Sequence, residues 1–258
     1  MRLVPVSPGS GPRLAARDAK PPHGLPRDLD AATTEVLDKL TGLQEALYAE
    51  GRRALLIVLQ GRDAAGKDGT IRHVCRAFNP QGTVIASFGV PTKQELAHDY
   101  LWRVHAAVPP RGKVGVFNRS HYEDVLAAGV HRLVPPAEWR QRYQQINEFE
   151  RMLTECGVTI VKFFLHISHA EQHRRLAKRL ADPHKNWKLS ESDIADYPLW
   201  GAYTRAYQDA IARCSTRWAP WYVVPADDKA KRNYWWRMCS GRLSRAWPRS
   251  TLERARRC

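Results

Sequence analysis

Short apolar runs alternate with helical patterns along most of this chain. Each run is rich in branched or aromatic apolar residues, which is typical of a buried strand. We expect five strands, at Ala54–Leu59, Thr83–Phe88, Lys113–Phe117, Val158–Ile167 and Trp221–Val224. Because helical stretches separate these strands, the pattern predicts an α/β fold with a doubly wound, five-stranded parallel sheet and helices on both faces.

A helix is predicted before the first strand. Apolar side chains recur there at helical spacing, at Val36, Leu37, Leu40, Leu43 and Leu47. This spacing places them on one face, so we expect an amphipathic helix that begins near Asp30 and ends near Glu50.

Three segments fall outside this alternation and set the expected domain boundaries. Residues 1–30 are rich in proline, which lacks a backbone donor, and contain few apolar residues, so a loosely held arm is expected. Residues 182–197 form a polar, basic insertion between two helical stretches, where we expect a helical lid. Residues 248–258 form a basic tail, which leaves residues 31–247 as one domain.

The charge balance indicates an anionic partner. Lysine and arginine number 41 against 26 aspartates and glutamates, so the formal net charge is +15. Nucleic acids, membrane surfaces and small polyanions are all attracted by such a charge, so only the chemistry of a binding site can distinguish them.

Cysteine usage and hydropathy indicate the compartment. The five cysteines are scattered, odd in number and without a CxxC pair, which disfavours a disulfide framework and a zinc ribbon. We find no secretory signal pattern and no apolar run of about 18 residues. We therefore expect a cytoplasmic protein without a membrane partner.

A phosphate-binding loop is predicted directly after the first strand. From Gly61 to Lys67 the spacing is G-x4-GK, in which glycines permit turns that aim backbone N–H groups at a phosphate and the lysine adds positive charge. Asp68 replaces the Ser or Thr that normally contacts Mg²⁺, so a carboxylate such as Asp63 is expected to take over part of that role. The predicted phosphate-binding residues of this loop are Gly61, Arg62, Ala64, Ala65, Gly66, Lys67, Asp68, Gly69 and Thr70.

A charged cluster follows the third strand, between Phe117 and Asp124. Open α/β sheets bind ligands at the carboxyl ends of their strands, so Arg119, Glu123 and Asp124 are expected to face the phosphate loop. The same segment is also typical of a helix start, with Ser120 as the cap and Glu123 three residues later. The two interpretations are compatible.

Several motifs, in this order, resemble those of the family-2 polyphosphate kinases. They are GRDAAGKDGTI (61–71), NPQG (79–82), SFGVPT (87–92), ELAHDYLWR (95–103), FNRSHYEDV (117–125), NEFERML (147–153), DPHKNWKLS (182–190) and APWYVVPADDKAKRN (219–233). The resemblance covers residues 32–240. It implies a P-loop kinase fold of the thymidylate-kinase type, Mg²⁺ as cofactor with Mn²⁺ as an alternative ion, and phosphoryl transfer between inorganic polyphosphate and nucleotides. It also implies a homodimer or homotetramer.

The same resemblance implies roles for individual residues. The implied catalytic residues are Asp63, Lys67, Arg119, Glu123 and Asp124. Asp63 and Asp124 are expected to bind the metal ion, and Lys67 and Arg119 to contact the phosphates. Glu123 is expected to distinguish between acceptors. The YED sequence resembles the third class of the family, which phosphorylates nucleoside monophosphates such as AMP as well as diphosphates such as ADP. Further phosphate contacts are expected from Arg151, Arg175, Lys178, Arg179, Lys185 and Lys188.

Two other functions stay open on the sequence alone. An ATP-dependent nucleotide kinase would share the fold and differ in its phosphoryl donor. A nucleic-acid-binding P-loop protein would use the basic residues within 229–257. The chain lacks the interleaved basic and aromatic motifs of an RNA-binding sheet, so nucleic acid is not expected as a partner. Zinc is not expected either, because no cysteine or carboxylate pair accompanies His166, His169 and His173.

Overall fold

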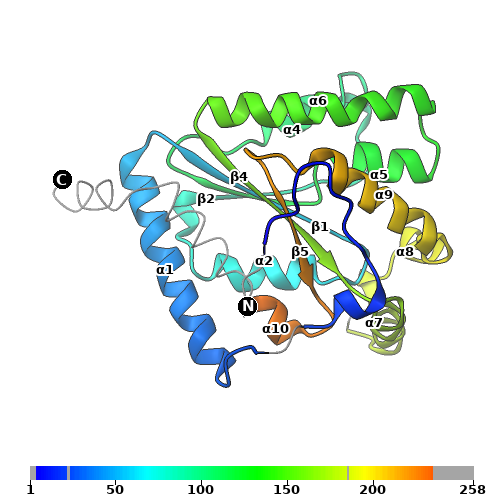
Figure 1. Cartoon of the computed structure of the whole chain (residues 1–258), viewed down its shortest axis with the longest axis horizontal. Coiled ribbons are helices and arrows are strands. Elements are labelled where there is room, and N and C mark those ends of the chain that lie inside the picture. Colours follow the sequence, from blue (N-terminus) through cyan, green and yellow to red (C-terminus); the bar gives the residue numbers. More distant parts are fainter. Residues whose placement is uncertain (1–3, 22–23, 185, 235–258) are drawn as a thin grey trace.

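All five strands run parallel in one sheet, in the order β2-β3-β1-β4-β5 (Figure 1). The computed structural model describes residues 4–21, 24–184 and 186–234. The strands are β1 (Ala54–Gly61), β2 (Thr83–Ser87), β3 (Val114–Asn118), β4 (Val158–His166) and β5 (Trp221–Pro225). Each overlaps a predicted run, and the predicted doubly wound parallel sheet is confirmed.

Helices cover both faces of the sheet (Figure 1). One face carries α1 (Leu29–Glu50) and α2 (Lys67–Cys75), against which α10 (Lys229–Tyr234) packs; the other carries α5 (Glu123–Val130), α6 (Pro136–Glu155) and α9 (Trp200–Cys214). The remaining helices are α3 (Lys93–Leu96), α4 (Trp102–Ala106), α7 (His169–Ala181) and α8 (Glu191–Asp196), with 3-10 turns η1 (Ala16–Ala19), η2 (Pro80–Gly82), η3 (Asn186–Lys188) and η4 (Tyr197–Leu199). None of the helices in the described ranges is long and apolar enough to cross a bilayer.

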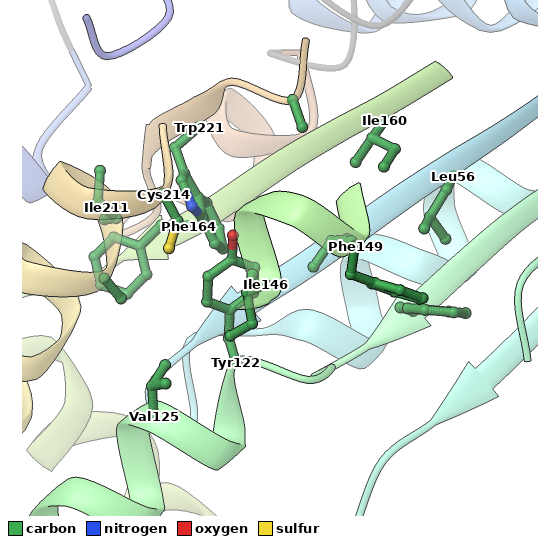
Figure 2. Close-up of a cluster of buried hydrophobic side chains, with 14 of the residues drawn as sticks. Leu56, Tyr122, Val125, Ile146, Phe149, Ile160, Phe164, Ile211, Cys214 and Trp221 are labelled. Atoms are coloured by element: carbon green, nitrogen blue, oxygen red, sulfur yellow. The ribbon is translucent and has the colours of Figure 1, made fainter. Parts of the chain in front are cut away.

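Strand β1 sends alternate side chains into two hydrophobic cores. Leu55, Ile57 and Leu59 enter the core under α1 and α2, whereas Leu56 and Val58 enter the core under α5, α6 and α9. Figure 2 shows the second core, with Leu56 among its labelled side chains. A central parallel strand is buried on both faces, which explains why the sequence of β1 is continuously apolar.

The chain changes sides of the sheet at β1, which pairs with β3 on one edge and β4 on the other. Open α/β sheets bind ligands at such a point, beyond the carboxyl ends of the strands. Leu59 of β1 is in register with Asn118 of β3, and the Arg119 N–H donates to the Leu59 carbonyl at 3.0 Å. The phosphate loop and the charged cluster after β3 therefore start side by side.

The N-terminal segment is held more firmly than the sequence predicts. Residues 4–21 run along β5 and α9, as the dark blue trace of Figure 1 shows. The Val6 N–H donates to the Trp221 carbonyl at 2.9 Å, and Nε2 of His166 lies 2.9 Å from the Ala15 carbonyl oxygen. The expectation of a loose arm is wrong for these residues. Proline removes only its own N–H donor, so the other residues of the segment keep theirs, and every residue keeps a carbonyl oxygen that distant groups can bond.

The predicted lid segment contains short helices. Residues 182–197 carry η3 and α8 between α7 and α9. Helix α8 starts with a reciprocal cap, in which the Ser190 hydroxyl accepts from the Asp193 N–H and the Asp193 carboxylate accepts from the Ser190 N–H. Lid movement and the domain boundaries stay predictions, and the basic tail at 248–258 lies outside the described residues.

A buried ion pair joins β4 to α6 beneath the site. Lys162 donates to Glu150, to the Tyr122 hydroxyl at 2.8 Å and to the Cys214 carbonyl at 2.7 Å, while the Tyr122 hydroxyl donates to Glu150 at 3.0 Å. His121 completes the cluster, 3.2 Å from the same carboxylate. Burial opposes ionisation of Glu150, but Lys162 and His121 outweigh burial and lower its pKa.

We expect Glu150→Gln to lower the free energy of unfolding by about 3 to 5 kcal/mol, because the substitution leaves the Lys162 ammonium buried without its counter-charge. Denaturant unfolding measures the change. The wild type keeps the contribution of Glu150 above the unfolded pKa of 4.5 and loses it as the pH falls through the lower folded value.

The control for Glu150→Gln is the double variant Glu150→Gln/Lys162→Met, which removes both charges. This double variant is expected to be more stable than Glu150→Gln alone. A single variant within 1 kcal/mol of the wild type, on the order of one hydrogen bond, would contradict a coupled buried pair.

Candidate active site

The two glycines of the G-x4-GK motif have different structural roles. Gly66, just before α2, has φ 98°, a left-handed conformation that glycine adopts without strain. Gly61 has no positive φ, but a Cβ there would lie 3.0 Å from the Leu165 carbonyl oxygen on neighbouring β4. A second left-handed residue of the loop is Ala64, with φ 62°. The motif therefore combines one turn glycine with one close approach of backbones.

Lys67 is buried at the start of α2. Its Nζ donates to the Gly61 carbonyl at 2.6 Å and to the Arg62 carbonyl at 3.3 Å. Burial lowers the pKa of Lys67 and Arg119 adds to this effect, whereas the carboxylates of Asp63, Glu123 and Asp68 oppose it. The ammonium thus lies among the charged groups that the sequence predicts for catalysis.

Arg119 connects the two loops. Its φ is 63°, and its guanidinium donates to Asp63 Oδ1 at 2.7 Å. Burial opposes the charge of Arg119, but Glu123 and Asp63 outweigh it and raise the pKa. Burial also raises the pKa of Glu123, against the effect of Arg119 and Lys67. The structure thus brings Asp63, Lys67, Arg119 and Glu123 into one cluster.

Asp124 does not join this cluster. Its carboxylate lies 3.9 Å from Arg103 and 3.6 Å from Arg142, and burial raises its pKa against these two guanidinium groups. Asp63 and Asp124 line different cavities. The metal roles of Asp63 and Asp124 stay predictions, and the geometry favours Asp63, because the carboxylate of Asp124 is turned toward two guanidinium groups.

A basic cavity of about 1060 Å³ opens between the phosphate loop, α7 and α10. From the loop it is lined by Ala64, Gly66, Lys67, Asp68 and Gly69, and its cations are Lys67, Arg119, Arg174, Arg175, Lys178, Arg179, Lys229 and Arg232. Burial lowers the pKa of Lys229, and the positive charges of Arg175, Arg232, Lys178 and Arg174 lower it further. Such a concentration of positive charge favours a polyanionic ligand.

Oxygen donors suited to a divalent cation line the same cavity. Asp63, Asp68 and Asn118 all face it, and Asn118 Nδ2 donates to Asp68 Oδ1 at 3.0 Å. Asn118 Oδ1 is buried without a hydrogen-bond partner in the described chain. Within the described ranges no three His, Cys, Asp or Glu side chains converge on one point. Carboxylates supplemented by substrate phosphates are the usual protein site for Mg²⁺, so these residues fit that ion.

A second cavity, of about 910 Å³, lies on the other side of Arg119. Its apolar walls come mainly from Phe88, Val90, Tyr100, Leu101, Leu133 and Val134, and its charged groups include Arg103, Arg142, Glu123 and Asp124. The basic cavity and the second cavity share four lining residues: Phe88, Gly89, Val90 and Arg119. The two cavities are therefore adjacent, and Arg119 is the charged residue among those four.

The side chain of Arg62, a predicted phosphate ligand, lines neither of the two large cavities. Its guanidinium stacks 3.7 Å from the centre of the Trp200 ring and donates to the Thr204 hydroxyl. Burial lowers the pKa of Arg62 to about 10. Both partners, Trp200 and Thr204, lie on α9, so these contacts attach the phosphate loop to that helix. The guanidinium interacts with the face of the Trp200 ring.

The other predicted phosphate ligands differ in where they lie, and their binding roles stay predictions. Lys178 and Arg179 line the basic cavity, whereas Arg151 is exposed on α6 and pairs with Glu155 at 3.7 Å. Ala65 and Thr70 are fully buried and line neither large cavity, and Gly61 lines only a small pocket behind the loop. Lys185 lies outside the described residues, as does the side chain of Lys188.

Sequence reasoning missed five cationic residues of the site. Arg103 and Arg142 line the second cavity, and Arg174, Lys229 and Arg232 line the basic cavity. Arg103 ends the motif ELAHDYLWR, and Lys229 and Arg232 lie in APWYVVPADDKAKRN. The motifs could therefore have indicated Arg103, Lys229 and Arg232 as site residues. The spacing of residues within a motif does not show which side chains reach a cavity.

The sheet, the phosphate loop and the basic cavity define a phosphotransferase with the P-loop kinase fold. The family model described as Polyphosphate kinase 2 (PPK2) matches residues 26–240. The chain belongs to the polyphosphate kinase 2 family, as the sequence motifs predict.

Curated proteins and a solved structure agree with this family. The chain is 57% identical over 196 residues to an AMP/ADP-polyphosphate phosphotransferase of Meiothermus ruber, covering 76% of this chain and 73% of that one. It is 45% identical over 205 residues to an ADP-polyphosphate phosphotransferase of Rhodopseudomonas palustris, with 75% and 71% covered. The crystal structure of Polyphosphate Kinase 2 from Arthrobacter aurescens TC1 matches with a TM-score of 0.86 and 40% identity, over 94% of this chain and 91% of that chain.

We expect Lys67→Met to lower kcat for phosphoryl transfer by about a hundredfold or more, since removing one preorganised charge from a transition state has effects of this size. The methionine keeps the apolar stem of the buried side chain, so the melting temperature should change little. Lys39→Met, which removes an exposed charge on α1, is the matched control. A Lys67→Met variant with near-normal turnover would exclude Lys67 from catalysis.

Proposed function

We propose that this polyphosphate-dependent nucleotide kinase binds inorganic polyphosphate in the basic cavity and a nucleoside mono- or diphosphate in the second cavity. A phosphate oxygen of the nucleotide attacks the terminal phosphorus of the chain. The bond from that phosphorus to its bridging oxygen breaks, and the shortened polyphosphate leaves with the electron pair. The observation that carries this proposal is that the two cavities are adjacent and share Arg119.

Charge supports polyphosphate as the occupant of the basic cavity. Polyphosphate carries about one negative charge per unit, and cations on α7, α10 and the phosphate loop line the cavity together. Burial lowers the pKa of Lys229, and repulsion by the neighbouring cations lowers it further; an anionic chain would relieve that repulsion.

The walls of the second cavity support a nucleotide there. Phe88, Tyr100 and Leu133 offer apolar surface to a base, while Arg103 and Arg142 offer N–H donors to polar groups. AMP and ADP are the acceptors named for the relative from Meiothermus ruber, and ADP is named for the relative from Rhodopseudomonas palustris. Acceptance of AMP as well as ADP, predicted from the YED sequence, is part of this proposal.

The residues around Arg119 would do most of the chemistry by position and charge. Lys67 and Arg119 stabilise the negative charge that spreads over the transferred group, and Glu123 orients the acceptor. Mg²⁺, with Mn²⁺ as the alternative, would be held by Asp63 beside Asp68 and Asn118 and would neutralise charge on phosphate oxygens. Closure of residues 182–197 as a lid would exclude water from the reacting groups.

The two alternative functions receive less support. Membership of the polyphosphate kinase 2 family favours polyphosphate over ATP as the donor. The basic residues beyond 234, on which a nucleic-acid-binding function would depend, lie outside the described residues. A cytoplasmic location and a homodimer or homotetramer stay predictions; light scattering of the purified chain tests the oligomer.

The proposed function is tested by incubating the protein with polyphosphate, Mg²⁺ and either AMP or ADP. Chromatography of the nucleotides should show ADP and ATP formed from AMP, and ATP formed from ADP. Parallel reactions with ATP as donor and no polyphosphate should show much slower phosphorylation of AMP. Phosphorylation with ATP alone would favour the ATP-dependent kinase, and failure to use AMP with polyphosphate would exclude the third class.

Asp63→Asn should lose activity that raised Mg²⁺ restores in part, because the amide keeps the shape of the side chain but lacks the charge that attracts the ion. The measurement is kcat against Mg²⁺ concentration, with the exposed Asp38→Asn as control. Asp124→Asn should keep the wild-type Mg²⁺ midpoint, since its carboxylate lies between Arg103 and Arg142. An Asp63→Asn variant with an unchanged midpoint would remove Asp63 from the metal site.

Glu123→Asn should lower kcat/KM for AMP more than for ADP, by about tenfold or more, which corresponds to roughly 1.4 kcal/mol of lost positioning. A monophosphate acceptor leaves space where a diphosphate has its terminal phosphate, and a carboxylate is suited to ordering a cation or water in that space. Steady-state kinetics on both acceptors measure the difference. Glu148→Gln on α6 is the control, and equal losses on the two acceptors would rule out discrimination by Glu123.

A further inference from the structure

Arg175 on α7 uses every donor of its guanidinium within the protein. An arginine has five N–H donors. The Nε–H donates to Glu171 Oε1 at 2.6 Å, and one terminal nitrogen donates to the carbonyls of Ala64 at 2.9 Å and Ala65 at 3.1 Å. The other donates to the carbonyls of Ala226 at 2.7 Å and Asp227 at 2.9 Å. A phosphate would have to break one of these five bonds.

These bonds tie together three parts of the fold. Ala64 and Ala65 belong to the phosphate loop, Ala226 and Asp227 follow β5, and Glu171 lies one turn earlier on α7. The Arg175 side chain is buried, and the carboxylate of Glu171 supplies its counter-charge. A buried, paired and fully bonded arginine has the properties of a structural joint and not those of a ligand-binding cation.

A second arginine acts on the same loop. Arg232 of α10 is also buried and donates to the Ala65 carbonyl at 3.4 Å. A Cβ on Gly66 would lie 2.1 Å from its guanidinium nitrogen, so the missing side chain of Gly66 admits Arg232 as well as permitting the turn. The loop backbone is therefore held at Ala65 by arginines from two helices.

We infer that Arg175 is a positioning residue that fixes the phosphate loop for catalysis and does not itself bind polyphosphate. A trans peptide is planar, with its carbonyl and the following N–H in opposite directions. Holding the carbonyls of Ala64 and Ala65 therefore fixes the directions of the Ala65 and Gly66 N–H groups. The inference rests on polyphosphate-dependent transfer as the function of the site.

Lysine is the substitution that separates the two roles. Its ammonium is a point charge with three donors and satisfies a phosphate well, but it cannot reproduce the planar fork that reaches five acceptors. Arg179, one turn further along α7, also lines the basic cavity, where it pairs with Asp193 at 3.8 Å. Arg175 and Arg179 thus allow a comparison of a positioning arginine with a candidate phosphate ligand on one helix.

The test measures kcat, KM for polyphosphate and the salt dependence of that KM. Arg175→Lys should lower kcat by about tenfold or more, whereas Arg179→Lys should stay within about threefold of the wild type. In Arg175→Gln the slope of log KM against log salt should be unchanged. Arg179→Gln should reduce that slope by about 0.7, the value for one lost phosphate contact. Arg53→Lys, an arginine paired with Glu50 outside both large cavities, is the matched control.

Two results would overturn the inference. One is a wild-type kcat for Arg175→Lys, and the other is a reduced salt slope for Arg175→Gln. Circular dichroism and melting temperature check that each variant folds. If the Arg175 variants do not fold, Glu171→Gln is measured instead: kcat should fall with an unchanged salt slope, and unchanged kcat would count against the inference. A wild-type protein that does not transfer from polyphosphate would instead refute the proposed function.

Discussion

Repulsion between cations crowded on one cavity is the constraint on which the site depends. The protein gathers lysines and arginines from three elements around the phosphate loop, and it offsets part of their repulsion with its own groups. Arg119 is paired with Asp63, Arg175 with Glu171, and Arg62 lies on the ring of Trp200. The cations that lack such firm partners are left to interact with an anionic substrate.

The successful predictions from the sequence depend on local patterns and on strand order. The strands and the phosphate loop are local patterns, so their residues alone reveal them: the run from Ala54 is apolar because β1 is buried on both faces, and Gly66 is required by a left-handed turn. The gathering of Lys67, Arg119 and Glu123 follows from strand order, which fixes where the carboxyl ends of β1 and β3 meet.

The sequence cannot show in which direction a charged side chain points or which groups it bonds to. Arg175 and Arg179 both line the basic cavity one turn apart, yet Arg175 bonds to carbonyls from two distant loops, whereas Arg179 pairs with Asp193. Asp124 follows Glu123 directly but turns toward Arg103 and Arg142. Each of these outcomes depends on residues far away along the chain, so no local pattern encodes it.

The N-terminal segment has a consequence for the sheet itself. Strand β5 is an edge strand, and an exposed edge offers unpaired N–H and carbonyl groups to strands of other molecules. The Val6 N–H bonds to the Trp221 carbonyl, and the Ser215 hydroxyl donates to the Val6 carbonyl, so residues near Val6 cover the start of this edge. A proline-rich segment suits this position, because it caps the edge while having few donors with which to recruit a further strand. Covered in this way, the start of β5 offers fewer unpaired groups to a strand of another molecule.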